Sequence, residues 1–319
     1  MLKKISCVLL CCLLALGIVF SGGCGEPLPA ESQSVDEKPQ IVATVFAAYD
    51  FARRICGDAA DVSLLLPPGA ESHSYEPPAR DIIKISGCDL LICVGGESEA
   101  WVDSVLDSLD GQITVLRMMD CVQTVVEETV EGMENGEEHE PEEAEYDEHV
   151  WTSPKNAILI AQAIQEALSA ADPDNSALYF SNRLYFVEEL DALDRDFAEF
   201  FAGVDKKLMI FGDRFPLRYF VEEYGIEYYA AFPGCSAQSE PSAATMAFLI
   251  DKVKSEGVKA VFYIEFSRHL IADSISEATG VRTALFHTCH NVTQDEMSAG
   301  VSYISLMRGN LATLREVMQ

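Results

Sequence analysis

Short apolar runs alternate with amphipathic segments along the chain from Gln40 onward. The apolar runs are rich in β-branched and aromatic residues, which favours strands, and the segments between them carry apolar residues at helical spacing. The predicted strands are residues 41–46, 62–66, 90–95, 113–118, 208–211, 228–232, 260–264 and 283–286. Strands separated by helices of this length indicate βαβ units and therefore parallel sheets.

The predicted helices fill the spaces between these strands and close the chain. They are residues 49–56, 81–86, 98–109, 154 to about 171, 215–224, 241–255, 269–279 and 299 to the end. We expect Ser239 or Glu240 to cap the helix that begins at Pro241.

One further helix is much longer than the others. Residues 175–201 contain neither glycine nor proline and keep apolar residues at helical spacing. At about 1.5 Å per residue this helix is about 40 Å long, enough to join two lobes rigidly. We therefore predict an α/β protein whose two lobes each hold a four-stranded parallel sheet with flanking helices. The predicted boundaries are 40–172 for the N-terminal lobe, 173–204 for the interlobe helix and 205–319 for the C-terminal lobe.

The first residues are typical of an export signal. A basic start is followed by an apolar core at residues 8–20 and by small residues before Cys24. A cysteine at this place resembles a bacterial lipobox, although Ser21 stands where leucine is usual. We expect a signal peptide at 1–23, a lipid on Cys24, a flexible tether at 24–39 and a location on the extracytoplasmic face of the cell membrane. The alternative is a secreted protein that is cleaved elsewhere.

The net charge and the spacing of the cysteines exclude some partners and some kinds of metal site. A net charge of −30 argues against nucleic acid as a partner and is compatible with cations. Six of the ten cysteines follow Cys24, and none forms a CxxC pair, so a thiolate zinc site is not expected. In an oxidising compartment a disulfide between Cys235 and Cys289 is one option. We expect a monomer.

An acidic stretch lies in the middle of the chain. Residues 127–148 contain twelve carboxylates and His139 but no lysine or arginine. Because unpaired carboxylates are costly to bury, we expect a mobile, solvated loop that gathers cations ahead of His149. Deletion of residues 131–145 should then spare the principal binding site. The alternative is a linker that only adds solubility.

Four of the six histidines follow predicted strands: His73, His149, His287 and His290. Ligands of parallel sheets bind beyond the carboxyl ends of the strands, and imidazole is a ligand for zinc and other divalent metals. Each histidine also has a structural interpretation, as a helix cap, as a residue packed beneath Trp151 or as a core residue. His269 is interpreted as a surface residue.

Two motifs resemble those of the solute-binding proteins of zinc and manganese ABC transporters. PGAESHSYEP at residues 68–77 is similar to their first metal motif, and EHVWTSP at 148–154 is similar to their second. The resemblance implies a lipid-anchored receptor, not an enzyme, that captures Zn²⁺ between two lobes and delivers it to a membrane permease. It implies His73 and His149 as ligands, and Mn²⁺ as the alternative metal.

The second lobe departs from the family pattern. The family ligand position falls on Arg214, and a guanidinium cannot coordinate a metal. Asp213 beside it is therefore a candidate. For the last ligand His290 fits best, His287 is next, and Glu265 is another option. A site dominated by histidine suits zinc better than manganese.

Two other classes of function stay open. A secreted zinc hydrolase would need an open coordination position and a general base, for which Glu265 or Glu76 is available, but no HExxH motif is present. A metal-stabilised adhesin lipoprotein would bind metal only at millimolar concentration. Its deletion would leave zinc uptake unchanged.

Overall fold

The computed structural model describes residues 38–71, 75–109, 113–134, 145–236 and 240–319. The chain from Lys38 to Gln319 forms one compact unit. The predicted signal peptide, Cys24, most of the tether, His73 and His139 lie outside the described residues.

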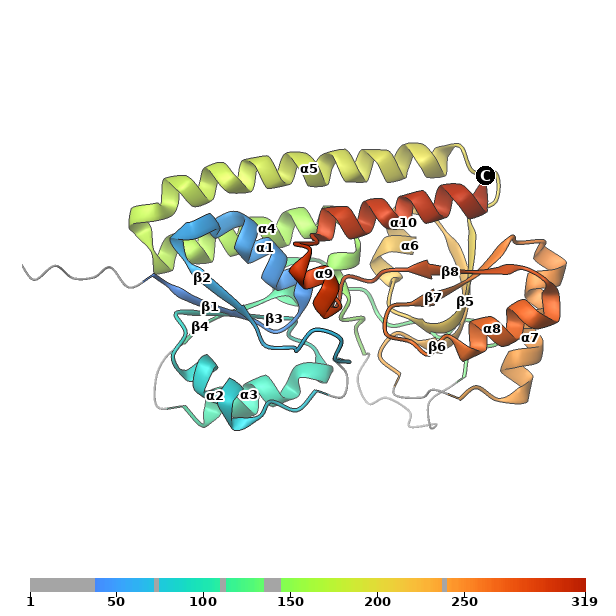
Figure 1. Ribbon diagram of the computed structural model, residues 1–319, viewed down its shortest axis with the longest axis horizontal. Coiled ribbons are helices and arrows are strands. Elements are labelled where there is room, and N and C mark those ends of the chain that lie inside the picture. Colours follow the sequence, from blue (N-terminus) through green and yellow to red (C-terminus); the bar gives the residue numbers. More distant parts are fainter. Residues whose placement is uncertain (1–37, 72–74, 110–112, 135–144, 237–239) are drawn as a thin grey trace, which may run out of the picture. The chain divides into compact units, whose positions relative to one another are not determined.

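The first sheet is built from four parallel strands in the order β2-β1-β3-β4. In Figure 1, helices α1 and α4 lie on one face of this sheet and α2 and α3 on the other. The elements are β1 (Gln40–Ala43), α1 (Phe46–Cys56), β2 (Asp61–Leu64), α2 (Ala79–Ser86), β3 (Leu90–Cys93), α3 (Ala100–Asp107), β4 (Thr114–Arg117) and α4 (Pro154–Ala171). Both faces are covered, which explains why β3 is buried along its whole length.

The second sheet repeats this plan with the order β6-β5-β7-β8, again all parallel. Its elements are β5 (Leu208–Phe215), α6 (Arg218–Tyr224), β6 (Glu227–Pro233), α7 (Ala243–Glu256), β7 (Ala260–Ile264), α8 (Leu270–Thr279), β8 (Arg282–Phe286), α9 (Gln294–Ser298) and α10 (Tyr303–Met318). The predicted α/β class with two four-stranded parallel sheets is therefore confirmed.

Helix α5 (Ser176–Ala202) links the two lobes, as predicted. Its first half packs on α1, where the rings of Phe51 and Phe186 lie 5.2 Å apart. Its second half packs on α6, where Phe197 and Phe220 lie 5.1 Å apart. The largest hydrophobic core includes residues of both sheets and of α5, so the lobes share one continuous interior.

Many element boundaries shift by a few residues from the sequence-based expectation, and three of the differences have a clear local cause. Strand β5 continues to Phe215 because a bulge after Phe211 restores its pairing with β6, and α6 begins only after Pro216. Ser242, not Ser239 or Glu240, caps α7, since its side chain accepts a hydrogen bond from Thr245 N. The last helix begins at Tyr303 because the short helix α9 precedes it.

Where the structure describes it, the acidic stretch is only partly a solvated loop, because Glu128, Glu131 and Glu145 are exposed but other residues are bonded or buried, which corrects the expectation in part. Residues 122–134, here called the strap, run from the first lobe onto the second. Glu134 N donates to Ala231 O of β6 at 2.9 Å, and Arg218 pairs with Glu128 at 2.9 Å. Asp147 is fully buried, and Glu148 is 6% exposed. Asp147 accepts a hydrogen bond from His149 N at 2.8 Å and Glu148 accepts one from Ser98 N at 2.9 Å. These partners offset the cost of burying the two carboxylates.

The strap also adds apolar contacts. Met133 is 7% exposed and belongs to the main hydrophobic core. Gly132 has a positive φ of 84°, and a Cβ there would collide with the ring of Phe248. Val126 pairs with Tyr146 in an antiparallel bridge, so the chain that leaves along the strap returns beside it to His149.

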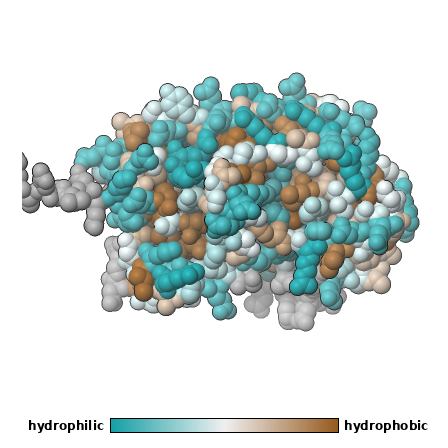
Figure 2. All heavy atoms as spheres, in the orientation of Figure 1, coloured by the Kyte–Doolittle hydropathy of each residue, from teal (hydrophilic) through white to brown (hydrophobic). Residues whose placement is uncertain are grey.

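The described cysteines are all free thiols, so Cys235 and Cys289 are not joined. Cys289 is buried, which raises the pKa of its thiol well above the usual value. Among the described residues, no helix combines the length and apolar character needed to cross a bilayer. Polar residues dominate the face shown in Figure 2, and apolar residues occur there in small patches.

Met133→Ala should lower the free energy of unfolding by about 2 kcal/mol or more, because it removes a buried side chain from the core. Glu131→Ala is the matched control, since this glutamate is 74% exposed and its ion pair with Lys252 is 3.6 Å long. Both variants are compared by chemical denaturation. Equal stability of the two variants would mean that the strap is a solvated linker, as its composition first indicated.

Candidate metal centre

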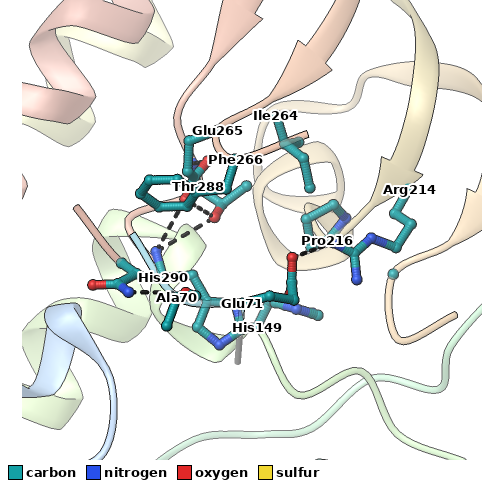
Figure 3. Close-up of a pocket in the computed structure, with 12 residues that line it drawn as sticks. Ala70, Glu71, His149, Arg214, Pro216, Ile264, Glu265, Phe266, Thr288 and His290 are labelled. Carbon is teal, nitrogen blue, oxygen red and sulfur yellow. Dashed lines mark hydrogen bonds and ion pairs between the residues drawn. The ribbon is translucent and has the colours of Figure 1, made fainter. Parts of the chain in front are cut away.

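A pocket lies where the carboxyl ends of the two sheets face each other (Figure 3). The first lobe and the segment after the strap supply Ala70, Glu71 and His149. The second lobe and the loop after β8 supply Arg214, Pro216, Gly234, Ile264, Glu265, Phe266, Thr288, His290 and Asn291. Such strand ends are the usual ligand-binding edge of a parallel sheet.

His149 lines this pocket and is completely buried. Asp147 Oδ1 accepts a hydrogen bond from the backbone N–H of His149 at 2.8 Å and lies 3.2 Å from ring atom Nδ1. Burial alone lowers the pKa of His149, but Asp147 outweighs this effect and the pKa is raised. A carboxylate behind Nδ1 places the lone pair on Nε2, as in histidines that bind metals.

His290 meets His149 from the loop that follows β8. The two rings lie edge to face with centroids 5.4 Å apart, and the ring of Trp151 lies 5.0 Å from His290. The carbonyl oxygen of His290 accepts a hydrogen bond from Phe46 N at 2.9 Å, so the first lobe helps to fix this second-lobe loop. Sequence reasoning placed both histidines at strand ends, and the structure brings them together.

Glu265 lines the pocket, but its oxygens are used by the loop that carries His290. They accept hydrogen bonds from Thr288 N at 2.7 Å and from Thr288 Oγ1 at 2.5 Å. From the first lobe, Trp151 Nε1 donates to Thr288 O at 2.9 Å. The geometry makes Glu265 a positioning residue for the loop rather than an open carboxylate.

His287 does not line the pocket. Its Nδ1 accepts a hydrogen bond from Cys289 N at 2.9 Å, which requires the proton to lie on Nε2. The backbone of His287 is held on both sides by the Asn310 side chain, at 2.7 Å each. A ring that uses one nitrogen as acceptor and carries the proton on the other has no lone pair for a metal, so the structure favours the core-residue interpretation.

Asp213 and Arg214 point to opposite sides of β5, as adjacent residues of a strand do. Asp213 is 7% exposed, lies outside the pocket and accepts hydrogen bonds from Arg214 N at 2.9 Å and Ile264 N at 3.3 Å. Burial raises the pKa of its carboxyl group. Arg214 instead reaches into the pocket, where it pairs with Glu71 at 2.8 Å (Figure 3).

Asn291 has a role that sequence reasoning missed. Its Nδ2 donates to Pro67 O at 2.8 Å and to Ala70 O at 2.9 Å, and Gly69 N donates to Val292 O at 2.9 Å. These bonds fix the turn that precedes His73. The only signal in the sequence was the position of an asparagine directly after His290.

Glu99 and His290 both line a second, small cavity. Burial raises the pKa of Glu99 to about 7, and the charge of Glu148 contributes, although Val94 N and Gly95 N donate to the carboxylate at 2.6 and 3.3 Å. This carboxyl group stabilises the loop after β3.

The donor chemistry fits a transition metal, since imidazole is preferred by zinc and its neighbours. Within the ranges that the structure describes, no group of three or more histidine, cysteine, aspartate or glutamate residues gathers to hold a metal ion. His73 lies outside those ranges, and the candidate histidines that line the pocket within them are His149 and His290.

Comparison with known proteins adds an independent result. Residues 41–317 match the family described as zinc-uptake complex component A, periplasmic. The chain is 32% identical over 318 residues to the zinc-binding lipoprotein AdcA of Streptococcus pneumoniae serotype 4 and spans 61% of the length of that relative. It is 29% identical over 312 residues to the high-affinity zinc uptake system protein ZnuA of Bacillus subtilis, covering 95% of each chain.

A solved structure agrees with these matches. The Zn(II)-bound ZnuA-like domain of Streptococcus pneumoniae AdcA has a TM-score of 0.73 and 30% sequence identity to this chain. The match covers 88% of this chain and 99% of that domain.

Glu99→Gln should change how stability depends on pH. A folded-state pKa of about 7, against 4.5 for an ordinary glutamate, means that the folded protein binds this proton more tightly. The contribution of Glu99 is therefore complete below pH 4.5 and is lost as the pH rises through about 7.

The variant cannot ionise, so it should gain stability relative to the native protein between about pH 5 and about pH 8. Denaturation of both proteins across this range measures the difference. A difference that is constant with pH, or of opposite sign, contradicts the assignment.

Proposed function

Because this chain belongs to the zinc-uptake complex component A family, we propose that it captures Zn²⁺ in the pocket between its lobes and delivers it to the membrane permease of an ABC transporter. The metal is the cargo rather than a resident cofactor. His149 and His290 bind it through their imidazole rings. His73, from the first of the two motifs, is the third ligand.

The observation that carries this proposal is the meeting of two imidazoles from different parts of the chain. His149 reaches the pocket after the strap, and His290 reaches it after β8, with ring centroids 5.4 Å apart. Asp147 stands behind the first ring, and Glu265 fixes the loop of the second. Such outer partners orient metal-binding histidines and strengthen binding.

The proposed setting follows from the relatives. One of them is named a lipoprotein, and we propose that this chain is likewise anchored through Cys24 on the extracytoplasmic face of the cell membrane. We propose that it acts as a monomer whose partners are the metal ion and the permease.

Binding without catalysis is the function that the pocket supports best. A zinc hydrolase needs a general base close to the metal-bound water. Of the described residues that line the pocket, the two carboxylates are already bound, Glu71 by Arg214 and Glu265 by Thr288. We therefore propose a transport role rather than a hydrolase, and the match to a zinc-uptake family favours transport over an adhesin whose metal is only structural.

His73→Ala, His149→Ala and His290→Ala should each weaken zinc binding by about a hundredfold or more, because each removes one of few ligands. Competition titrations with a zinc chelator measure the affinity. Thermal denaturation shows whether each variant is folded, which matters for the buried His149.

Two other histidines serve as controls. His269→Ala should bind zinc like the native protein, since its ring is 48% exposed and pairs with Asp273. His287→Ala should lose stability but much less affinity than the three ligand variants, since its ring fixes Cys289 N and does not line the pocket. Native affinity in His149→Ala or His290→Ala, or binding as weak as expected for those variants in a folded His287→Ala, would overturn the proposed ligand set.

A further inference from the structure

Among the residues that the structure describes, two carboxylates line the pocket, and both are held by other side chains. Glu71 Oε2 lies 2.8 Å from Arg214 Nη2 across the lobe interface. Glu265 accepts two hydrogen bonds from Thr288, at 2.7 and 2.5 Å. A metal that is to be bound through either carboxylate must first break these charge-assisted contacts, which are among the stronger hydrogen bonds in proteins.

The contact of Glu265 with Thr288 and that of Glu71 with Arg214 have different consequences for the pocket. Thr288 belongs to the loop that carries His290, so the bond to Glu265 serves the shape of the site. Arg214 is only 15% exposed and is a permanent cation at the wall of a pocket for cations. Its charge opposes any divalent metal, and Glu71 compensates that charge only while the ion pair stays closed.

Metals respond differently to these constraints. Manganese prefers carboxylate oxygen, whereas imidazole suits zinc. A manganese ion would have to take Glu71 away from Arg214 and would then leave the guanidinium close to the metal without its counter-charge. A zinc ion bound by His149 and His290 leaves the ion pair closed.

We propose that the Arg214–Glu71 ion pair determines the metal specificity of the pocket, because it withholds a carboxylate ligand and so favours Zn²⁺ over Mn²⁺. This inference rests on the proposed function, since it concerns the same pocket. Arg214 thus stands where the family has a metal ligand, and in this chain the residue at that position selects between metals instead of binding one.

The test compares Zn²⁺ and Mn²⁺ affinities of the full chain by competition titration. Arg214→Leu removes the guanidinium and adds no metal ligand, so Glu71 is released from the ion pair. Manganese affinity should rise about tenfold more than zinc affinity. Arg214→Gln should shift the ratio of manganese to zinc affinity in the same direction. It replaces Arg214→Leu as the test variant if the leucine variant does not fold.

Two further variants separate the released carboxylate from simple loss of positive charge. Glu71→Gln leaves Arg214 without its counter-charge and should weaken both metals without favouring manganese. In Arg214→Leu combined with Glu71→Gln, the gain for manganese should disappear, which is the coupling expected of two residues that act through one contact.

Arg218→Gln is the matched control, because Arg218 is 18% exposed and pairs with Glu128 at 2.9 Å in the same lobe but outside the pocket. It should keep the native ratio. An unchanged ratio in a folded Arg214→Leu, or a gain for manganese that persists in the double variant, would overturn the inference. Absence of tight zinc binding in the native chain would instead overturn the proposed function.

Discussion

The candidate site depends on one loop, residues 287–292, that is bonded to both lobes. From the first lobe, Trp151 donates to the carbonyl of Thr288, and Phe46 N donates to the carbonyl of His290. Asn291 in turn holds the turn at residues 67–70. Because backbone groups of the loop are hydrogen-bonded to the first lobe, the loop is fixed and the ring of His290 is held against that of His149. A pocket fixed in this way by the polypeptide lowers the cost of ordering ligands when a metal binds.

Charge is distributed in this pocket in an unusual way for a cation site. The chain carries a net charge of −30, yet Arg214 forms part of the pocket wall. The pocket carboxylates Glu71 and Glu265 are bonded to Arg214 and Thr288. General acidity can attract cations to the surface, but the donors inside the pocket decide which cation is retained. In this account, the imidazoles select the metal and the ion pair keeps the competing oxygen ligands occupied.

Periodicity in the sequence was sufficient for the architecture, because alternating apolar runs and the uninterrupted helix at residues 175–201 depend on local pattern. His149 and His290 were identified because each follows a predicted strand. The carboxyl ends of parallel strands lie at the same edge of a sheet, so residues that follow them can meet there. The strap was missed, since its acidic composition says nothing of Arg218 or of the backbone of β6, which meet it only in the fold. The different roles of Asp213 and Arg214 follow from strand β5, which is four residues longer than expected. The hydrogen bonds of His287 and Glu265 are tertiary contacts, which the spacing of residues in the sequence does not reveal.

The central claim is that imidazoles hold zinc while Glu71 stays on Arg214. Crystals grown with equal amounts of Zn²⁺ and Mn²⁺ test it most directly, by anomalous scattering at the absorption edges of both metals. We expect a zinc signal alone, about 2.0–2.1 Å from ring nitrogens of His149 and His290, with the Arg214–Glu71 pair intact. A manganese signal in the pocket, or a metal bound by Glu71 or Asp213 in place of the imidazoles, would contradict it.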